Sequence, residues 1–244
     1  MELSEKKTAI LQLQKDLLFL QGVHSPKRGE PATFGLGAIE SAFPHQRFPT
    51  GGVHDFLTTS VESAAATTGF IAALLGRMIK DHGVAVWISR KQSVFPPGLV
   101  AYGIDPHRIL FMDLPNQNER LWAMEESLKT AGLAVVVGET PGLNFIESRR
   151  FQLAVESSRV TAFVIRPSQK SPERIACLAQ WKVTSIPSEF EAGINVIGFP
   201  RWNIELLKAR NGKPGKWMIE WNKDRFTHIL PETTSAGILE RKTG

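Results

Sequence analysis

Two adjacent threonines, Thr67 and Thr68, follow a short apolar run and a polar turn, at the head of a predicted helix. This layout is typical of phosphate-binding loops, in which backbone N–H groups of a glycine-rich turn surround the phosphates of a nucleotide. A loop lysine contacts the β- and γ-phosphates, and a Ser or Thr hydroxyl holds Mg²⁺. Residues 48–70 are therefore the segment in which nucleotide chemistry would lie.

The spacing Gly-x-x-x-x-Gly-Lys-Thr places Ser60 and Ala65 at the two glycine positions and Ala66 at the lysine position. Both glycine positions thus carry a Cβ, and alanine brings no positive charge to a triphosphate. Of the chemically active positions, only Thr67 keeps its residue type. We therefore expect a degenerate nucleotide loop, without catalytic residues or a cofactor, formed by Ser60, Glu62, Ser63, Ala65, Ala66, Thr67 and Thr68.

The elements that would position this loop alternate between short apolar runs and helical patterns. Apolar runs of this kind are typical of strands buried on both faces of a parallel sheet. They cover residues 53–57, 84–88, 109–112, 134–137 and 162–165. Helices are predicted between them, at residues 67–80, 119–130 and 148–158. The alternation predicts an α/β fold with a mainly parallel central sheet flanked by helices.

The C-terminal part changes to alternation of period two, at residues 181–186, 196–210 and 216–221. Because Asn-Gly-Lys-Pro-Gly at 211–215 is a strong turn signal, we expect antiparallel strands that extend the sheet. The chain is accordingly divided into an N-terminal helical arm and linker, a core, and a flexible C-terminal tail. Their predicted ranges are 1–32, 33–226 and 227–244.

The composition indicates a globular protein of a reducing compartment. Of 244 residues, 42% are hydrophobic and 22% charged, which excludes wholesale disorder. A lone cysteine, Cys177, excludes an internal disulfide framework, and the six histidines show no metal-ligand spacing. No apolar run approaches the roughly 20 residues that span a bilayer, and the charged N-terminus shows no signal-peptide pattern. We expect a protein of the bacterial cytoplasm with no membrane contact.

The net charge of +5 is concentrated near the C-terminus, since residues 201–244 hold nine basic and five acidic side chains. Such a local excess permits an anionic partner such as DNA. Paired arginines on a helix also occur as a solvated face, and charged turns also protect sheet edges, so both interpretations stay open. The candidate contacts for DNA or a partner protein are Arg149, Arg150, Lys208, Arg210, Lys213 and Lys216.

Residues from about 48 to 221 resemble the core of the RecA recombinase, in register over most of the chain. The matching segments are 62–63, 67–68, 86–93, 102–110, 134–139 and 163–166. The resemblance implies a RecA-like α/β core with the P-loop NTPase fold. The chain is shorter than RecA at the places of its two DNA-binding loops, between 141 and 148 and between 167 and 174.

The same resemblance implies that four groups of an ATPase site are missing. Ala66 stands at the loop lysine, and Lys91 stands at the catalytic glutamate. Gly138 stands at the Walker B aspartate, and Arg166 stands at the glutamine that senses the γ-phosphate. Glu139 follows Gly138, but adjacent strand residues point to opposite faces. The resemblance thus implies a pseudo-ATPase, with Arg166 as a further candidate contact for DNA or a partner.

Other segments resemble the ImuA family of RecA-like mutagenesis proteins more closely than RecA. They are residues 48–56, 62–69, 121–128, 148–154 and 207–215. This resemblance implies a non-catalytic accessory protein of error-prone translesion DNA synthesis, acting in damage-induced mutagenesis and SOS-type DNA repair. The implied partners are an ImuB-type Y-family polymerase homologue and an alternative replicative-type DNA polymerase. RecA is a further candidate partner, and weak DNA binding stays open.

Two alternatives remain from other functional classes. One is an ATP-dependent protein that binds single-stranded DNA and uses Thr67, Glu139 and Arg166 as an atypical nucleotide site. It predicts nucleotide-dependent affinity for single strands. The other is a cell-division inhibitor of the RecA-like superfamily, which predicts binding to a tubulin-like filament protein.

Overall fold

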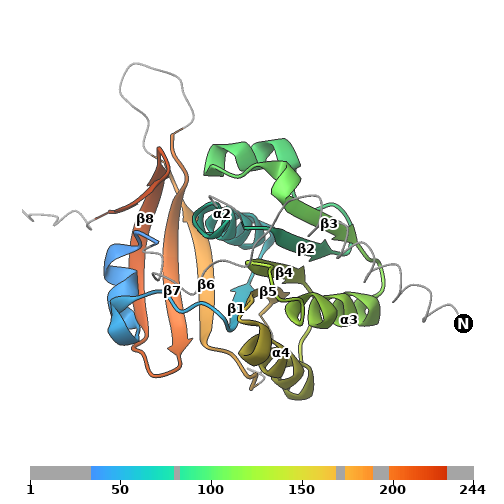
Figure 1. Cartoon of the computed structure of the whole chain (residues 1–244). Helices are drawn as coiled ribbons and strands as arrows, with labels where there is room; N and C mark the ends of the chain where they lie inside the picture. The colour runs from blue at the N-terminus through green and yellow to red at the C-terminus, as the bar shows by residue number, and fades with distance from the viewer. Residues whose placement is uncertain (1–33, 80–82, 169–173, 189–197, 230–244) are drawn as a thin grey trace, which may run out of the picture.

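The computed structural model of the chain describes residues 34–79, 83–168, 174–188 and 198–229. Within these residues one nine-stranded sheet is flanked by helices (Figure 1). The strands are β1 (Val53–Thr58), β2 (Ala85–Ser89), β3 (Ile109–Asp113), β4 (Val135–Glu139), β5 (Thr161–Pro167), β6 (Ala179–Ile186), β7 (Arg201–Ala209), β8 (Gly215–Asn222) and β9 (Arg225–His228). Their order across the sheet is β3-β2-β4-β5-β1-β6-β7-β8-β9.

Three α-helices and four short 3₁₀ helices complete the described part of the chain. The α-helices are α2 (Val61–Met78), α3 (Gln117–Leu128) and α4 (Phe145–Ser158). The 3₁₀ helices are η1 (Gly37–Ala42), η2 (Pro44–Gln46), η3 (Pro96–Tyr102) and η4 (Pro106–Arg108). The predicted arm at 1–32 lies outside the described residues.

The sheet changes direction at β6. From β3 to β6 all neighbours pair in parallel, whereas β6, β7, β8 and β9 pair antiparallel. The predicted fold class, a mainly parallel α/β sheet extended by C-terminal antiparallel strands, is confirmed. The sheet continues to His228, two residues past the predicted core boundary, and the His228 ring bonds the Leu36 carbonyl at 2.8 Å.

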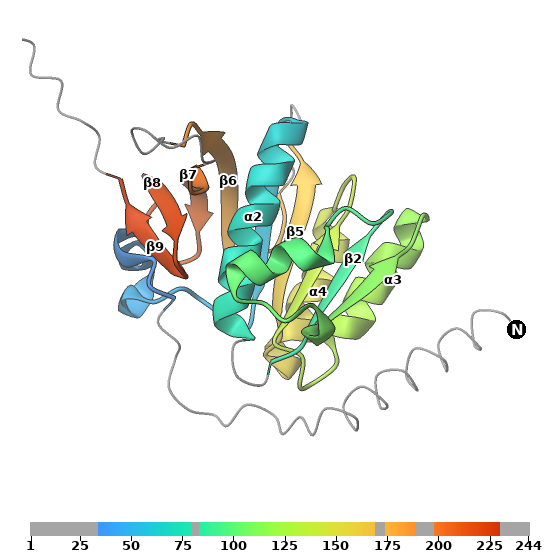
Figure 2. The same cartoon turned by 90° about the horizontal axis from the view of Figure 1, so that it is seen from above.

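Two apolar clusters cover the opposite faces of the sheet, because successive strand residues point to opposite sides. Val137 packs in the cluster that contains α2, whereas its neighbour Val136 packs in the cluster that contains α3 and α4. Figure 2 looks onto the face that α2 covers, with α4 behind the strands. The carboxyl ends of the parallel strands therefore emerge between α2 on one side and the α3–α4 pair on the other.

A layer of aromatic rings fills the space between β1, β6 and the segment that precedes β1. Trp181 on β6 is fully buried, with Phe56 stacked 6.1 Å away and Phe48 stacked 5.9 Å away. The His54 imidazole lies in the same layer, 4.8 Å from the Phe48 ring and nearly parallel to it. The layer joins the parallel and antiparallel halves of the sheet through side-chain packing.

The His54 ring is hydrogen-bonded at both nitrogens inside this layer. Its Nδ1 accepts a hydrogen bond from the Trp181 indole at 3.1 Å, which leaves Nε2–H to donate to the Pro49 carbonyl at 2.8 Å. Burial lowers the pKa of His54 from 6.5 to about 4, although the bond to Pro49 opposes the shift. The folded protein therefore keeps this imidazole neutral.

Acidification should destabilise the protein through His54. The unfolded chain binds a proton there near pH 6.5, whereas the folded chain does so only near pH 4, so stability falls as the pH drops through this window. Between pH 7 and 5 this single group should remove about 2 kcal/mol of unfolding free energy. In His54→Gln the amide can keep both hydrogen bonds without titrating. Urea unfolding at both pH values should show a smaller pH dependence in this variant, and an equal dependence would contradict the assignment.

Candidate functional site

The predicted nucleotide loop is not a loop. Ser60 is the extended N-cap of α2, and its Oγ accepts a hydrogen bond from the Ser63 N–H at 3.2 Å. The helix begins at Val61, six residues before the predicted start at Thr67. Alanines at 64–66 have the highest helix propensity of any residue, and there is no glycine between Ser60 and Thr67 to hold an open turn. The prediction of a loop at these positions is therefore wrong.

This helix start uses the N–H groups that a phosphate-binding loop would present. The Ala64 N–H already donates to the Ser60 carbonyl at 3.0 Å, as the first intrahelical bond. The exposed Glu62 carboxylate has a lowered pKa because it accepts hydrogen bonds from the Ser60 side chain and from its own N–H. A negative charge thus already occupies the N-terminus of α2, where a phosphate would otherwise be stabilised.

The hydroxyl groups of Ser63 and Thr67 point into the protein. Thr67 is fully buried, and its Oγ1 donates to the Ser63 carbonyl at 2.8 Å. The Ser63 Oγ in turn donates to the Val183 carbonyl of β6 at 2.9 Å. Both hydroxyls therefore connect α2 to itself and to the sheet, and neither is available as a Mg²⁺ ligand.

The positions that correspond to the catalytic glutamate and the Walker B aspartate in the RecA resemblance lie at or just after the carboxyl ends of β2 and β4. A Cβ built at Gly138 would lie 2.1 Å from the Met124 methyl carbon of α3, so an aspartate there would require the Met124 side chain to move. Glu139 points to the other face of the sheet, where it accepts hydrogen bonds from the Trp87 indole at 3.0 Å and from the Ser93 hydroxyl. Lys91 is exposed in the segment after β2.

Arg166, predicted as a surface contact, lies inside the protein. Its side chain is 3% exposed and forms a bidentate ion pair with Asp55 of β1, with distances of 2.8 and 3.0 Å. The Gln180 amide donates to the same carboxylate at 2.8 Å. Arg166 is therefore unavailable to DNA or a partner, because its guanidinium neutralises a fully buried carboxylate. Asp55 was missed from sequence, although an aspartate inside an apolar strand was a usable signal.

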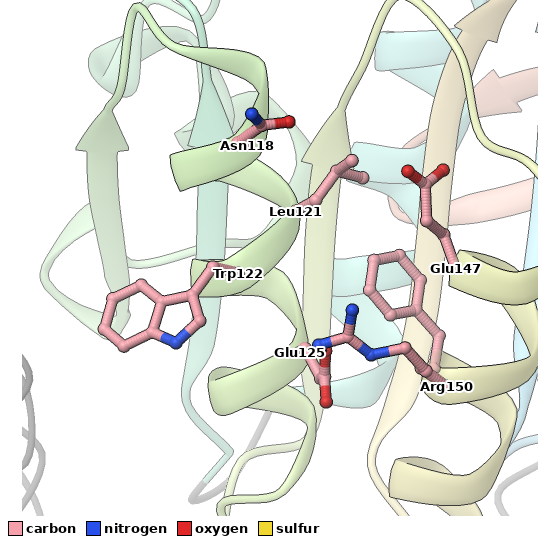
Figure 3. A pocket seen from close by; sticks show the side chains of 7 residues that line it. Asn118, Leu121, Trp122, Glu125, Glu147 and Arg150 are labelled. Atoms are coloured by element: carbon pink, nitrogen blue, oxygen red, sulfur yellow. Dashed lines mark ion pairs between the residues drawn. The ribbon is translucent and has the colours of Figure 1, made fainter.

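Arg149 and Arg150 take different roles at the start of α4. Arg150 reaches across to α3 and forms an ion pair with Glu125, above a pocket of about 210 Å³ between the two helices (Figure 3). Arg149 is exposed and pairs with no described residue. Of this predicted pair, Arg149 is thus the freer contact and Arg150 also holds α3 to α4.

The basic residues of the C-terminal hairpin surround the β7–β8 turn. Lys216 lies 3.6 Å from Glu205 across the two strands. Lys208, Arg210 and Lys213 are exposed and form no ion pair with any described residue. Arg210 also lines a groove of about 480 Å³ together with Arg47, which sequence reasoning did not single out. Three of the four predicted residues are therefore exposed around the same hairpin without an ion pair to any described residue.

No model of a known protein family matches the chain. Two similar relatives are the proteins named ImuA of Caulobacter vibrioides strains NA1000 / CB15N and ATCC 19089 / CIP 103742 / CB 15. Each is 30% identical over 200 residues, which span 77% of this chain and 82% of the relative. The chain belongs to the ImuA family. The family predicted from the sequence segments is thereby confirmed.

A more distant relative of this ImuA-family chain is a protein named cell division inhibitor SulA, from Edwardsiella piscicida. It is 25% identical over 96 residues, which span 39% of this chain and 57% of that protein.

In the part of the chain that the structure describes, every helix falls short of the length and apolar character of a membrane span. The same residues contain no group of three or more His, Cys, Asp or Glu side chains able to hold a metal ion.

The buried position of Arg166 predicts a stability defect rather than a binding defect. Arg166→Met leaves the Asp55 carboxylate buried with only Gln180 beside it, which should cost about 3 kcal/mol or more of unfolding free energy. Arg149→Met, the exposed counterpart, should change stability by about 0.5 kcal/mol or less. Urea unfolding of both variants measures the difference, and equal stabilities would refute the structural role of the ion pair.

Proposed function

We propose that this chain is a non-catalytic adaptor of an error-prone translesion DNA synthesis complex in damage-induced mutagenesis. In this role it acts with an ImuB-type Y-family polymerase homologue and an alternative replicative-type DNA polymerase, and RecA is a further candidate partner. Membership of the ImuA family supports the mutagenesis role. The absence of turnover rests on the geometry around α2.

The observation that carries the proposal is the first turn of α2. A phosphate-binding site needs free N–H groups, a cation and a hydroxyl that reaches Mg²⁺. Here the turn is helical from Val61, Glu62 places a carboxylate at its N-terminus, and the Thr67 hydroxyl is buried against the helix backbone. Each of the three requirements fails for a separate physical reason, which argues against repair of the site by any single neighbour.

The ATP-dependent motor is the weaker candidate because its three proposed residues already have other partners. Thr67 bonds Ser63, Glu139 bonds Trp87, and Arg166 pairs with Asp55. The cell-division inhibitor is also weaker, because the similarity to SulA covers 39% of this chain, against 77% for the ImuA relatives.

The purified full chain should give no saturable heat when Mg-ATP is titrated to millimolar concentration in a calorimeter. The physical reason is that the helical turn offers no cradle of N–H groups and no cation to the phosphates. An intact RecA serves as the positive control. Saturable binding that Thr67→Ala abolishes would overturn the pseudo-ATPase and favour the motor.

Partner binding is tested separately from nucleotide binding. The immobilised full chain should retain an ImuB-type polymerase homologue from the same genome, with and without ATP to the same extent. The same resin carrying an unrelated protein of similar charge is the control. If the folded chain does not retain that homologue, the adaptor role fails, whatever the calorimetry gives.

A further inference from the structure

A groove lies at the edge of the sheet opposite to the first turn of α2, where β1 and β6 begin and β7 ends. It has a volume of about 480 Å³, within the range of sites that hold several side chains or a small ligand. Its lining combines apolar residues with two arginines. The lining residues used below are Phe43, Arg47, Phe48, Leu178, Arg210 and Asn211.

The walls of this groove are fixed by backbone contacts. On one wall His45 and Gln46 both have positive φ angles, of 59° and 52°, a conformation that residues other than glycine adopt only when the surroundings impose it. On the other wall Asn211 has a φ of 57°, and the Lys213 N–H donates to the Ala42 carbonyl at 2.8 Å. The two walls are therefore tied to each other, and the groove is preformed.

The floor of the groove is apolar and rigid. Phe43 and Phe48 are 5% and 4% exposed, because their rings pack against Trp181 in the aromatic layer. Leu178 lies directly against Gly52, where a Cβ would come within 2.1 Å of its side chain. A ligand can therefore bury an apolar group here, but the two phenylalanine rings leave little open surface for stacking.

The rim carries positive charge that is not paired with any acidic residue in the described part of the chain. Arg47 stands on one wall and Arg210 on the other, and both are exposed. Lys208 and Lys213 flank Arg210 on the hairpin, and none of the four forms an ion pair with a described residue. Guanidinium groups on both sides of an apolar floor favour a ligand that has carboxylates next to an apolar anchor.

We infer that this groove binds a short acidic peptide segment of a partner protein, in which one aromatic or aliphatic side chain is flanked by Asp or Glu. The anchor enters between the two walls, and Arg47 and Arg210 each bind a flanking carboxylate. The inference rests on the proposed adaptor function, because it supplies that function with a surface for a partner.

Single-stranded DNA is the less favourable occupant of the same groove. Non-specific binding of single strands depends on bases stacked on aromatic faces, in addition to phosphates paired with cations. Since Phe43 and Phe48 are almost fully buried in the aromatic layer, the groove offers cations without a stacking platform. An apolar side chain uses this floor better than a base does.

Selection from a random peptide display library tests the inference directly. The full-length chain is the bait, and the double variant Arg47→Glu/Arg210→Glu is the counter-selection. We expect enriched peptides that share an apolar anchor next to Asp or Glu. One enriched peptide, fluorescently labelled, should bind the double variant at least about tenfold more weakly than the wild-type chain in anisotropy titrations.

The matched control is Lys91→Glu/Arg225→Glu, which makes the same change of net charge at two exposed positions outside the groove and should bind the peptide like the wild-type chain. Thermal unfolding checks that both double variants are folded. Peptides without acidic enrichment, or no peptide enriched over the counter-selection, would overturn the inference. The inference would also be overturned if a labelled oligothymidylate, and no peptide, bound the wild-type chain and lost that binding in Arg47→Glu/Arg210→Glu. The selection uses no polymerase homologue. A failed selection therefore counts against the groove as a peptide site, whereas a failed pull-down counts against the adaptor role.

Discussion

Trp181 occupies the position on which the two halves of this sheet depend. Its strand, β6, is the only described strand that pairs in parallel on one side and antiparallel on the other. The stacked rings of Phe48 and Phe56 hold this strand against β1. The Ser63 hydroxyl donates a hydrogen bond to the Val183 carbonyl of the same strand. The position of β6 therefore also fixes the first turn of α2. The closed, helical first turn of α2 is therefore coupled to the packing of the sheet.

Apolar runs and periodicity predicted the sheet well, because strands buried on both faces leave a direct signal in the sequence. The predicted strands at 53–57 and 109–112 differ from β1 and β3 only at their C-terminal ends. The start of α2 was missed by six residues, because the motif analogy assigned a loop where three alanines and a serine cap specify a helix. Local propensity was the better guide there, and it was present in the sequence.

The environment of Arg166 could not be predicted in the same way. Its partner Asp55 is 111 residues away along the chain, and only the pairing of β1 with β5 brings the two side chains together. An unpaired arginine in the sequence is equally compatible with a surface contact. The grouping of Arg47 with Arg210 is likewise a product of topology, since it requires η2 and the β7–β8 turn to meet at one edge of the sheet.

The contact between Gly138 and Met124 has a consequence for how this protein can change over evolutionary time. An aspartate at position 138 would collide with the buried Met124 side chain of α3, so it could be accommodated only if that side chain moved or became smaller. An open first turn of α2 would in addition need replacements among the residues that cap and form this turn. The residue types that positions 138 and 124 can hold are thus coupled, and a change at one of them constrains the other.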